Sequence, residues 1–205
     1  MDAKSLNQSK TAQAVKLVFA VLILPILIGF VRGLVEQISR LEPYCWKSLY
    51  WGVAGYLLFH IFLIEPLKFY KRTQRFIQII FGFFLPLFKV AYYLVPFWAL
   101  VVIGSYAVLG KVFKIEGLEV LFFFLSGFIF TMHIVMVAKL LKVDELRKLI
   151  DYLFIIFIVL IINIFFFSAN LKLYEPGFSV AQVGKEGLDL GVGLAKAIFD
   201  QLFVP

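Results

Sequence analysis

Residues 118–138 read LEVLFFFLSGFIFTMHIVMVA, an almost unbroken run of apolar side chains. A helix gains about 1.5 Å per residue, so the run is long enough to cross the roughly 30 Å hydrocarbon core of a bilayer. Its segment Phe122-Phe123-Phe124 directs apolar rings around the whole helix, whereas a helix on a soluble protein has one apolar stripe. The stretch therefore predicts a helix that lies in lipid.

The composition of the whole chain agrees with this prediction. Of its 205 residues, 62% are hydrophobic and 16% are charged, against roughly 45–50% and 25% in ordinary globular proteins. The formal net charge is +7, but the basic residues lie between apolar runs and indicate membrane topology rather than nucleic-acid binding. Cys45 is the single cysteine, which excludes an intramolecular disulfide and a multi-cysteine metal site.

The apolar runs predict an all-α fold: a polytopic integral membrane helical bundle over residues 1–174, with about five transmembrane helices and one interfacial amphipathic helix. A C-terminal, non-membrane amphipathic helix follows in residues 175–205. The first apolar run has no small-residue cleavage site after it, so we interpret it as a span rather than a signal peptide. The predicted spans are residues 15–31, 47–64, 90–109, 118–138 and 152–169.

The apolar residues 76–109 are too many for one upright span, because a single helix would be about 51 Å long. Just before them, Lys68, Lys71, Arg72 and Arg75 share one helical face. This spacing predicts an interfacial helix over about 68–85 that contacts lipid headgroups, followed by a span. Generic attraction to anionic lipid explains the basic face as well as a specific lipid site does. A re-entrant hairpin is the alternative, and it would reverse the topology downstream.

The positive-inside rule gives the orientation of this bundle. With the N-terminus in the cytoplasm, the segments on the cytoplasmic side carry more lysine and arginine than those on the other side. We therefore expect a plasma or bacterial inner membrane protein, with its N-terminus cytoplasmic and its C-terminus on the opposite side.

Polar side chains inside the predicted spans are candidate functional groups, because a polar group in lipid is costly. His60 and His133 are expected at similar depth in the membrane, since both of their helices are expected to run from the outer side to the cytoplasmic side. One hypothesis is proton transfer or ligand binding, and the other is that these groups hydrogen-bond between helices and hold the bundle together. The predicted polar seam comprises His60, His133, Tyr56, Ser126 and Asn163.

The C-terminal segment predicts a helix over about 180–203 that begins after Ser179. Two i, i+4 pairs, Lys185–Asp189 and Lys196–Asp200, lie on one face. Small residues on another face would let a second helix approach closely. One hypothesis is that a partner docks here, and the other is that the helix rests on the membrane or on its own bundle. The predicted docking residues are Gly184, Gly187, Gly191 and Ala195, with Leu190, Leu194 and Ile198 beside them.

The sequence contains no phosphate-binding loop, zinc-protease motif or nucleophile elbow, and the loops are short. We expect a non-enzymatic integral membrane subunit, without cofactor or metal, that anchors or scaffolds a multi-subunit envelope assembly for transport or secretion. Its expected partners are membrane lipids and other subunits or copies of itself. The alternative is a small oligomeric transporter or channel with its polar seam at His60 and His133. An intramembrane lipid enzyme would need carboxylates or a His–Asp set that the spans lack.

Overall fold

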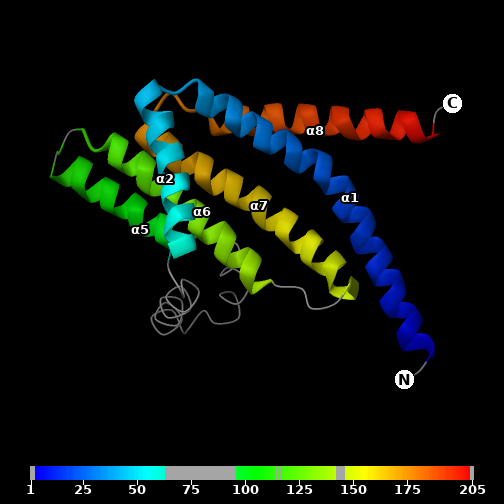
Figure 1. Cartoon of the computed structure of the whole chain (residues 1–205). Coiled ribbons are helices and arrows are strands. Elements are labelled where there is room, and N and C mark those ends of the chain that lie inside the picture. Colours follow the sequence, from blue (N-terminus) through cyan, green and yellow to red (C-terminus); the bar gives the residue numbers. More distant parts are fainter. Residues whose placement is uncertain (1–2, 63–95, 114, 116, 142–145, 204–205) are drawn as a thin grey trace.

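The computed structural model describes residues 3–62, 96–113, 115, 117–141 and 146–203. This part of the chain consists of helices and short connections, without strands (Figure 1). The predicted interfacial helix over 68–85 and the first residues of the predicted span 90–109 lie outside the described residues. The helices are α1 (Ala3–Ser39), α2 (Pro43–Phe62), α5 (Phe97–Tyr106), the π-helical η2 (Ala107–Val112), α6 (Glu119–Leu140), α7 (Leu146–Tyr174) and α8 (Val180–Phe203).

Three of the described helices are long and apolar enough to cross a membrane. They are the Thr11–Ser39 part of α1, all of α6, and the Leu149–Tyr174 part of α7. A shorter apolar helix, Phe97–Gly110, covers most of the predicted third span. The helix α2, which contains most of the predicted span 47–64, is not among the three. Its first half carries Lys47 and several tyrosines and tryptophans, so it is less apolar than the others.

Large apolar side chains remain exposed on the surfaces of these helices. In water such a continuous apolar surface would be unfavourable, whereas in a bilayer it is the surface that contacts lipid. The exposed apolar residues of α1 alone include Val15, Leu17, Val18, Phe19, Val21, Leu22, Leu24, Ile28, Val31 and Val35.

The contacts between helices show the direction in which each one runs. Lys16 pairs with Asp151 and Phe30 packs on Phe165, so α1 and α7 are parallel. Phe130 packs on Phe167. Ser126, earlier on α6, is hydrogen-bonded to Asn170, later on α7, so these two helices are antiparallel.

The helices α2 and α6 are parallel and cross with their backbones in contact. The hydroxyl of Ser48 donates to the carbonyl oxygen of Val120 at 2.6 Å, and Tyr56 packs on Phe128 further along both helices. A Cβ atom at Gly52 would overlap the backbone of α6, and one at Gly127 would overlap the backbone of α2. Glycine on both sides therefore makes this crossing possible.

These directions agree with the predicted topology, in which successive spans cross the membrane in opposite directions. The helices α1 and α7 run one way, and α2 and α6 run the other. Figure 1 shows the end of α1, the start of α2, the start of α6 and the end of α7 gathered at one end of the bundle. The start of α1, the end of α6 and the start of α7 lie toward the other end.

The first turns of α2 carry an aromatic cluster at the end where α1 and α2 meet. The ring centroids of Trp46 and Tyr50 are 5.7 Å apart, and the Lys47 ammonium lies 5.6 Å from the Trp46 centroid. Trp51 is 69% exposed. Tryptophan and tyrosine with a basic neighbour are enriched at the level of lipid headgroups. This pattern indicates a membrane–water interface at this end of the bundle.

Candidate functional site

The C-terminal helix α8 begins and ends as predicted. The chain leaves α7 at Tyr174, turns at Pro176 and Gly177, and enters α8 at Val180. The hydroxyl of Ser179 accepts a hydrogen bond from the backbone N–H of Gln182 at 3.2 Å, so the predicted N-cap is confirmed.

The helix α8 packs along the second half of α1 in the antiparallel direction, with backbone against backbone (Figure 1). A Cβ atom at Gly191 would lie 2.6 Å from Ile26 Cα. At Gly29 of α1, a Cβ atom would overlap the carbonyl oxygen of Gly187. Such distances are below any normal carbon contact, so the two helices can approach this closely only because glycine is present on both.

The small residues predicted to receive a partner therefore contact α1 and α7 of the same chain. Gly187 and Gly191 are buried against α1. A Cβ atom at Gly184 would lie 3.7 Å from the Phe165 ring of α7. In this arrangement a second protein would meet the other faces of α8. Of the remaining predicted docking residues, Ala195, Leu190 and Leu194 are half-buried and Ile198 is 47% exposed.

Polar contacts join the start of α8 to the end of α1. The Arg40 guanidinium lies 3.5 Å from a carboxylate oxygen of Glu186 and 2.9 Å from one of Glu36. The side-chain amide of Gln182 donates to the same Glu186 oxygen at 2.9 Å. Because these groups are partly exposed, each contributes little free energy, but together they orient α8 on α1.

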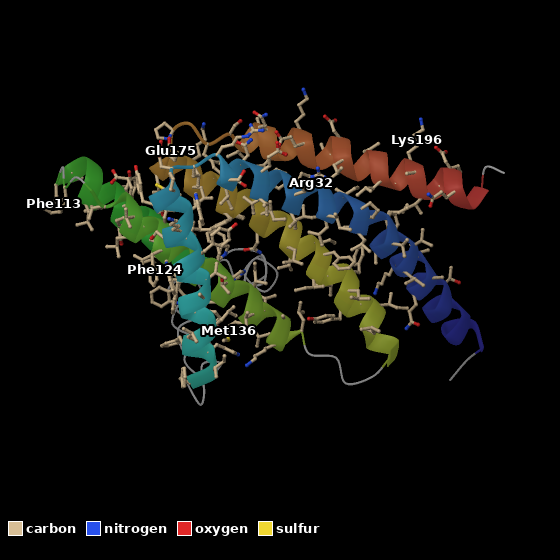
Figure 2. All side chains as sticks on the ribbon, turned by 45° about the horizontal axis from the view of Figure 1, so that its top comes forward. Arg32, Phe113, Phe124, Met136, Glu175 and Lys196 are labelled. Carbon is tan, nitrogen blue, oxygen red and sulfur yellow. The ribbon has the colours of Figure 1, made fainter. Side chains whose placement is uncertain are left out.

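The face of α8 opposite α1 carries charge and is exposed. In an α-helix successive side chains are about 100° apart, which places the two lysine–aspartate sets with i, i+4 spacing on the side away from the buried Gly187 and Gly191. Gly193 lies on this side with no other atom near its Cβ position. Figure 2 shows Lys196 pointing away from α1. The exposed charged residues are Lys185, Asp189, Lys196 and Asp200.

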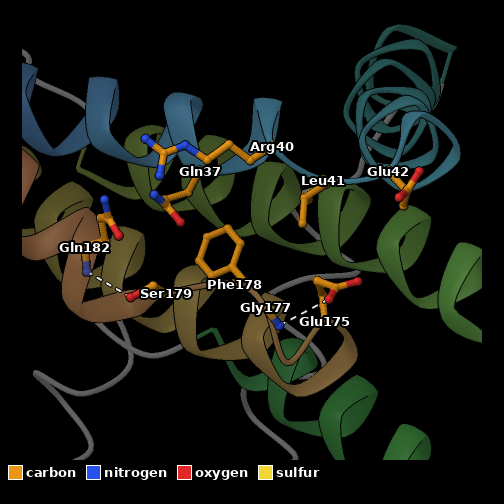
Figure 3. A pocket seen from close by; sticks show the side chains of 9 residues that line it. All are labelled: Gln37, Arg40, Leu41, Glu42, Glu175, Gly177, Phe178, Ser179 and Gln182. Atoms are coloured by element: carbon orange, nitrogen blue, oxygen red, sulfur yellow. Dashed lines mark hydrogen bonds between the residues drawn. The ribbon is translucent and has the colours of Figure 1, made fainter.

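A cavity of about 270 Å³ lies where the α1–α2 turn meets the α7–α8 turn (Figure 3). Phe178 and Leu41 form its apolar wall, and Arg40 lies along its rim. Gln37 also lines it, is 5% exposed, and has no partner for its Nε2 among the described residues. The cavity is lined by Gln37, Arg40, Leu41, Glu42, Glu175, Gly177, Phe178, Ser179 and Gln182.

The buried thiol of Cys45 lies in the first turn of α2. Its side chain is 2% exposed, and burial raises the pKa of the Cys45 thiol above its ordinary value. A buried thiol with little thiolate is chemically inert. Cys45 therefore belongs to the packed core rather than to a reactive site.

The predicted polar seam is divided between two places in the bundle. The Tyr56 hydroxyl and His60 Nδ1 are 3.1 Å apart on α2. On α6, Ser126 and His133 are 1% and 2% exposed. Asn163 on α7 is 1% exposed, and its amide donates to the carbonyl oxygen of Val159 in the same helix.

Ser126 is the centre of a buried hydrogen-bonded cluster that joins α6 to α7. Its hydroxyl accepts from the Asn170 amide at 3.3 Å and donates to the Tyr174 hydroxyl at 3.4 Å. The ring of Tyr174 packs on Tyr106, with centroids 4.6 Å apart, and on Phe122. Sequence reasoning did not include Asn170 and Tyr174 in the seam, although Asn170 is two helical turns after Asn163. The cluster joins polar groups of two helices, as in other membrane bundles, while Asn170 Oδ1 has no partner among the described residues.

The remaining sequence predictions concern a face for lipid headgroups and the expected lack of a metal. Lys68, Lys71, Arg72 and Arg75 lie outside the described residues. Within the described ranges, the histidine, cysteine and carboxylate side chains form no group of three that could hold a metal ion.

The chain matches no known protein family, no curated protein and no solved structure.

Proposed function

We propose that this chain is a non-enzymatic integral membrane subunit that anchors or scaffolds a larger envelope assembly of the transport or secretion type, with α8 as its docking element. The observation that carries the proposal is the asymmetry of α8. One face is packed, backbone against backbone, on the membrane helix α1, and the opposite face is charged and exposed.

The free-energy cost of placing glycines in a helix supports a functional role for α8. Each glycine in a helix interior costs about 1 kcal/mol relative to alanine. The helix α8 contains Gly184, Gly187, Gly191 and Gly193. Gly187 and Gly191 offset this cost through their contacts with α1, which fixes the direction of α8 relative to the membrane bundle. A docking element held in one orientation loses less conformational entropy when it binds.

The positive-inside rule and the directions of the helices support the proposed orientation in the membrane. With the N-terminus in the cytoplasm, α7 runs outward, parallel to α1, and delivers α8 to the opposite side of the membrane. The assembly partners would then meet α8 on that outer side.

Purification in mild detergent with measurement of the native mass tests this proposal. We expect the wild-type chain to be recovered with stoichiometric protein partners. A variant whose outer α8 charges are neutralised (Lys185→Gln, Asp189→Asn, Lys196→Gln and Asp200→Asn) should lose them while it keeps its thermal stability. The matched control neutralises Glu42 and Lys47, which are exposed on another surface. A wild-type chain that is recovered alone would contradict the proposal.

The second candidate is a small oligomeric transporter or channel, and the observation that favours it is the set of buried polar groups on apolar helices. His133, Ser126 and Asn163 are each at most 2% exposed. Buried polar side chains in membrane helices often mark a pathway. Ion or solute flux through pure protein in liposomes, lost in His133→Phe but retained by the α8 charge variant, would favour this function over the first.

A further inference from the structure

The four charges on the outer face of α8 have the same spacing from either end, and positions equally far from the centre of the pattern carry opposite charges. From the N-terminal side they read Lys185, Asp189, Lys196, Asp200, so that lysine and aspartate alternate. Lys185 and Asp189 are as far apart in sequence as Lys196 and Asp200. The centre of the pattern falls between Val192 and Gly193. All four side chains are exposed.

This pattern is complementary to itself when a second copy of α8 lies alongside in the antiparallel direction. With a two-fold axis between Val192 and Gly193, Lys185 lies opposite Asp200 of the second copy, and Asp189 lies opposite its Lys196. The symmetry repeats both pairs, so the four charges of each copy are all matched. A parallel copy in register would place lysine on lysine and aspartate on aspartate. An antiparallel copy shifted by one turn or more would leave charges unmatched.

The centre of the pattern is also the place where two helices can come closest. A Cβ atom at Gly193 would have nothing within 4 Å, so its surface is open to another chain. Val192 beside it is 58% exposed and supplies an apolar contact. A small residue at a crossing point lets two helical backbones approach. In α8, Gly187 and Gly191 contact α1, whereas a Cβ atom at Gly193 would contact none of the residues that the structure describes.

We propose that the outer face of α8 is the interface of a symmetric homodimer, in which two copies of α8 pack antiparallel about an axis beside Gly193. The inference rests on the proposed docking role of α8 and names its partner as a second copy of this chain. A two-fold contact of this kind is closed, so the assembly stops at two copies. In a pair related in this way, the two-fold axis is perpendicular to α8. Paired charges at the edge of such a contact give register and specificity more than affinity.

Two half-inverted full-length variants test the register. The first carries Lys185→Glu and Asp189→Lys, and the second carries Lys196→Glu and Asp200→Lys. Each variant keeps the net charge of the chain and an opposite-charge i, i+4 pair at both sites. At the inverted site the acidic residue precedes the lysine, which is the order that favours a helix. In a homodimer of either variant, however, all four intermolecular pairs would be between like charges.

The expected result is measured by light scattering and by crosslinking in mild detergent. The wild-type chain forms a dimer, and each variant alone has a dissociation constant at least about tenfold higher, since like charges oppose each other across the contact. An equimolar mixture of the two variants, carrying different tags, restores the dimer, because every charge then faces its opposite.

Three results would overturn the inference: a monomeric wild-type chain, self-association of the variants equal to that of the wild type, or a mixture that fails to restore the dimer. Recovery of the wild-type chain with stoichiometric unrelated subunits but without a second copy would also overturn it. That last result would leave the proposed membrane-subunit function standing, so the two proposals can be told apart.

Discussion

Gly191 of α8 lies directly against Ile26 of α1, so that a Cβ atom at Gly191 would be 2.6 Å from Ile26 Cα. The contact joins the C-terminal helix to the first membrane helix without a side chain between the two backbones. It is the central contact in our account of the chain, because it determines which face of α8 is hidden and which is presented.

Enlarging Gly191 should separate α8 from α1. We expect Gly191→Leu to lower the free energy of unfolding by about 1–3 kcal/mol, the usual cost of overpacking. The measurement is denaturant unfolding in mild detergent, followed by the loss of helical circular dichroism.

Gly104→Leu is the matched control, since it introduces the same side chain into α5, where nothing lies within 4 Å of the Cβ position of Gly104. Leucine is a better helix former than glycine, so this variant should be up to about 1 kcal/mol more stable. Equal destabilisation by both substitutions would contradict the packing described for α8.

The crossing of α2 and α6 should be equally sensitive to side-chain size. A Cβ atom at Gly52 would overlap the carbonyl oxygen of Phe124, so even Gly52→Ala should destabilise the chain by about 1–3 kcal/mol. Gly104→Ala in α5 is the control, because nothing lies within 4 Å of its Cβ position. Thermal melting of both variants decides the matter, and similar melting temperatures would be the unfavourable outcome.

The hydrogen bond between Ser126 and Tyr174 should contribute a small but measurable coupling between α6 and α7. We expect Ser126→Ala and Tyr174→Phe to be non-additive by about 0.6 kcal/mol, the average found for such pairs in membrane bundles. A double-mutant cycle measures this coupling without interference from the other contacts of each residue. Full additivity of the two substitutions would show that the 3.4 Å contact carries no energy.

The buried thiol of Cys45 should report on the folding of the whole bundle. Because Cys45 is 2% exposed, a maleimide reagent should label it slowly in the folded protein and rapidly after denaturation in SDS. Burial raises the pKa of the thiol, so less thiolate is present at a given pH, and labelling of the folded state should accelerate only at higher pH than for a free cysteine. The variant Cys45→Ala, which has no cysteine, shows the background. Rapid labelling of the folded protein at neutral pH would be inconsistent with the packing of α2.

The sequence predicted those features of this fold that depend on local pattern. The bounds of α8, its cap at Ser179 and the turn before it were all read from nearby residues, and the structure confirms them. Of the five predicted spans, three are helices of sufficient length and apolarity. Composition identified the membrane class because lipid must cover every face of such a helix.

The pairing of helices could not be predicted in the same way. The glycine strip of α8 predicted a close neighbour, but nothing local to it indicated that Gly29 of α1 would be part of that neighbour. The same holds for Gly127, which faces Leu49, and for Asn170, which bonds Ser126. These contacts join residues far apart in sequence, and they depend on how whole helices cross. A small residue shows where a crossing is possible, and the partner is decided by the bundle.

The most direct test of the account is the position of the two ends of α7 relative to the membrane. In a Cys45→Ala background, single cysteines replace Lys139, near the end of α6, and Gly177, in the turn before α8; both positions are exposed. In intact cells, a membrane-impermeant maleimide should label Gly177→Cys directly and Lys139→Cys only after the membrane is permeabilised. Labelling of both cysteines from the same side would mean that α7 does not carry the chain across the membrane, and the account would be wrong.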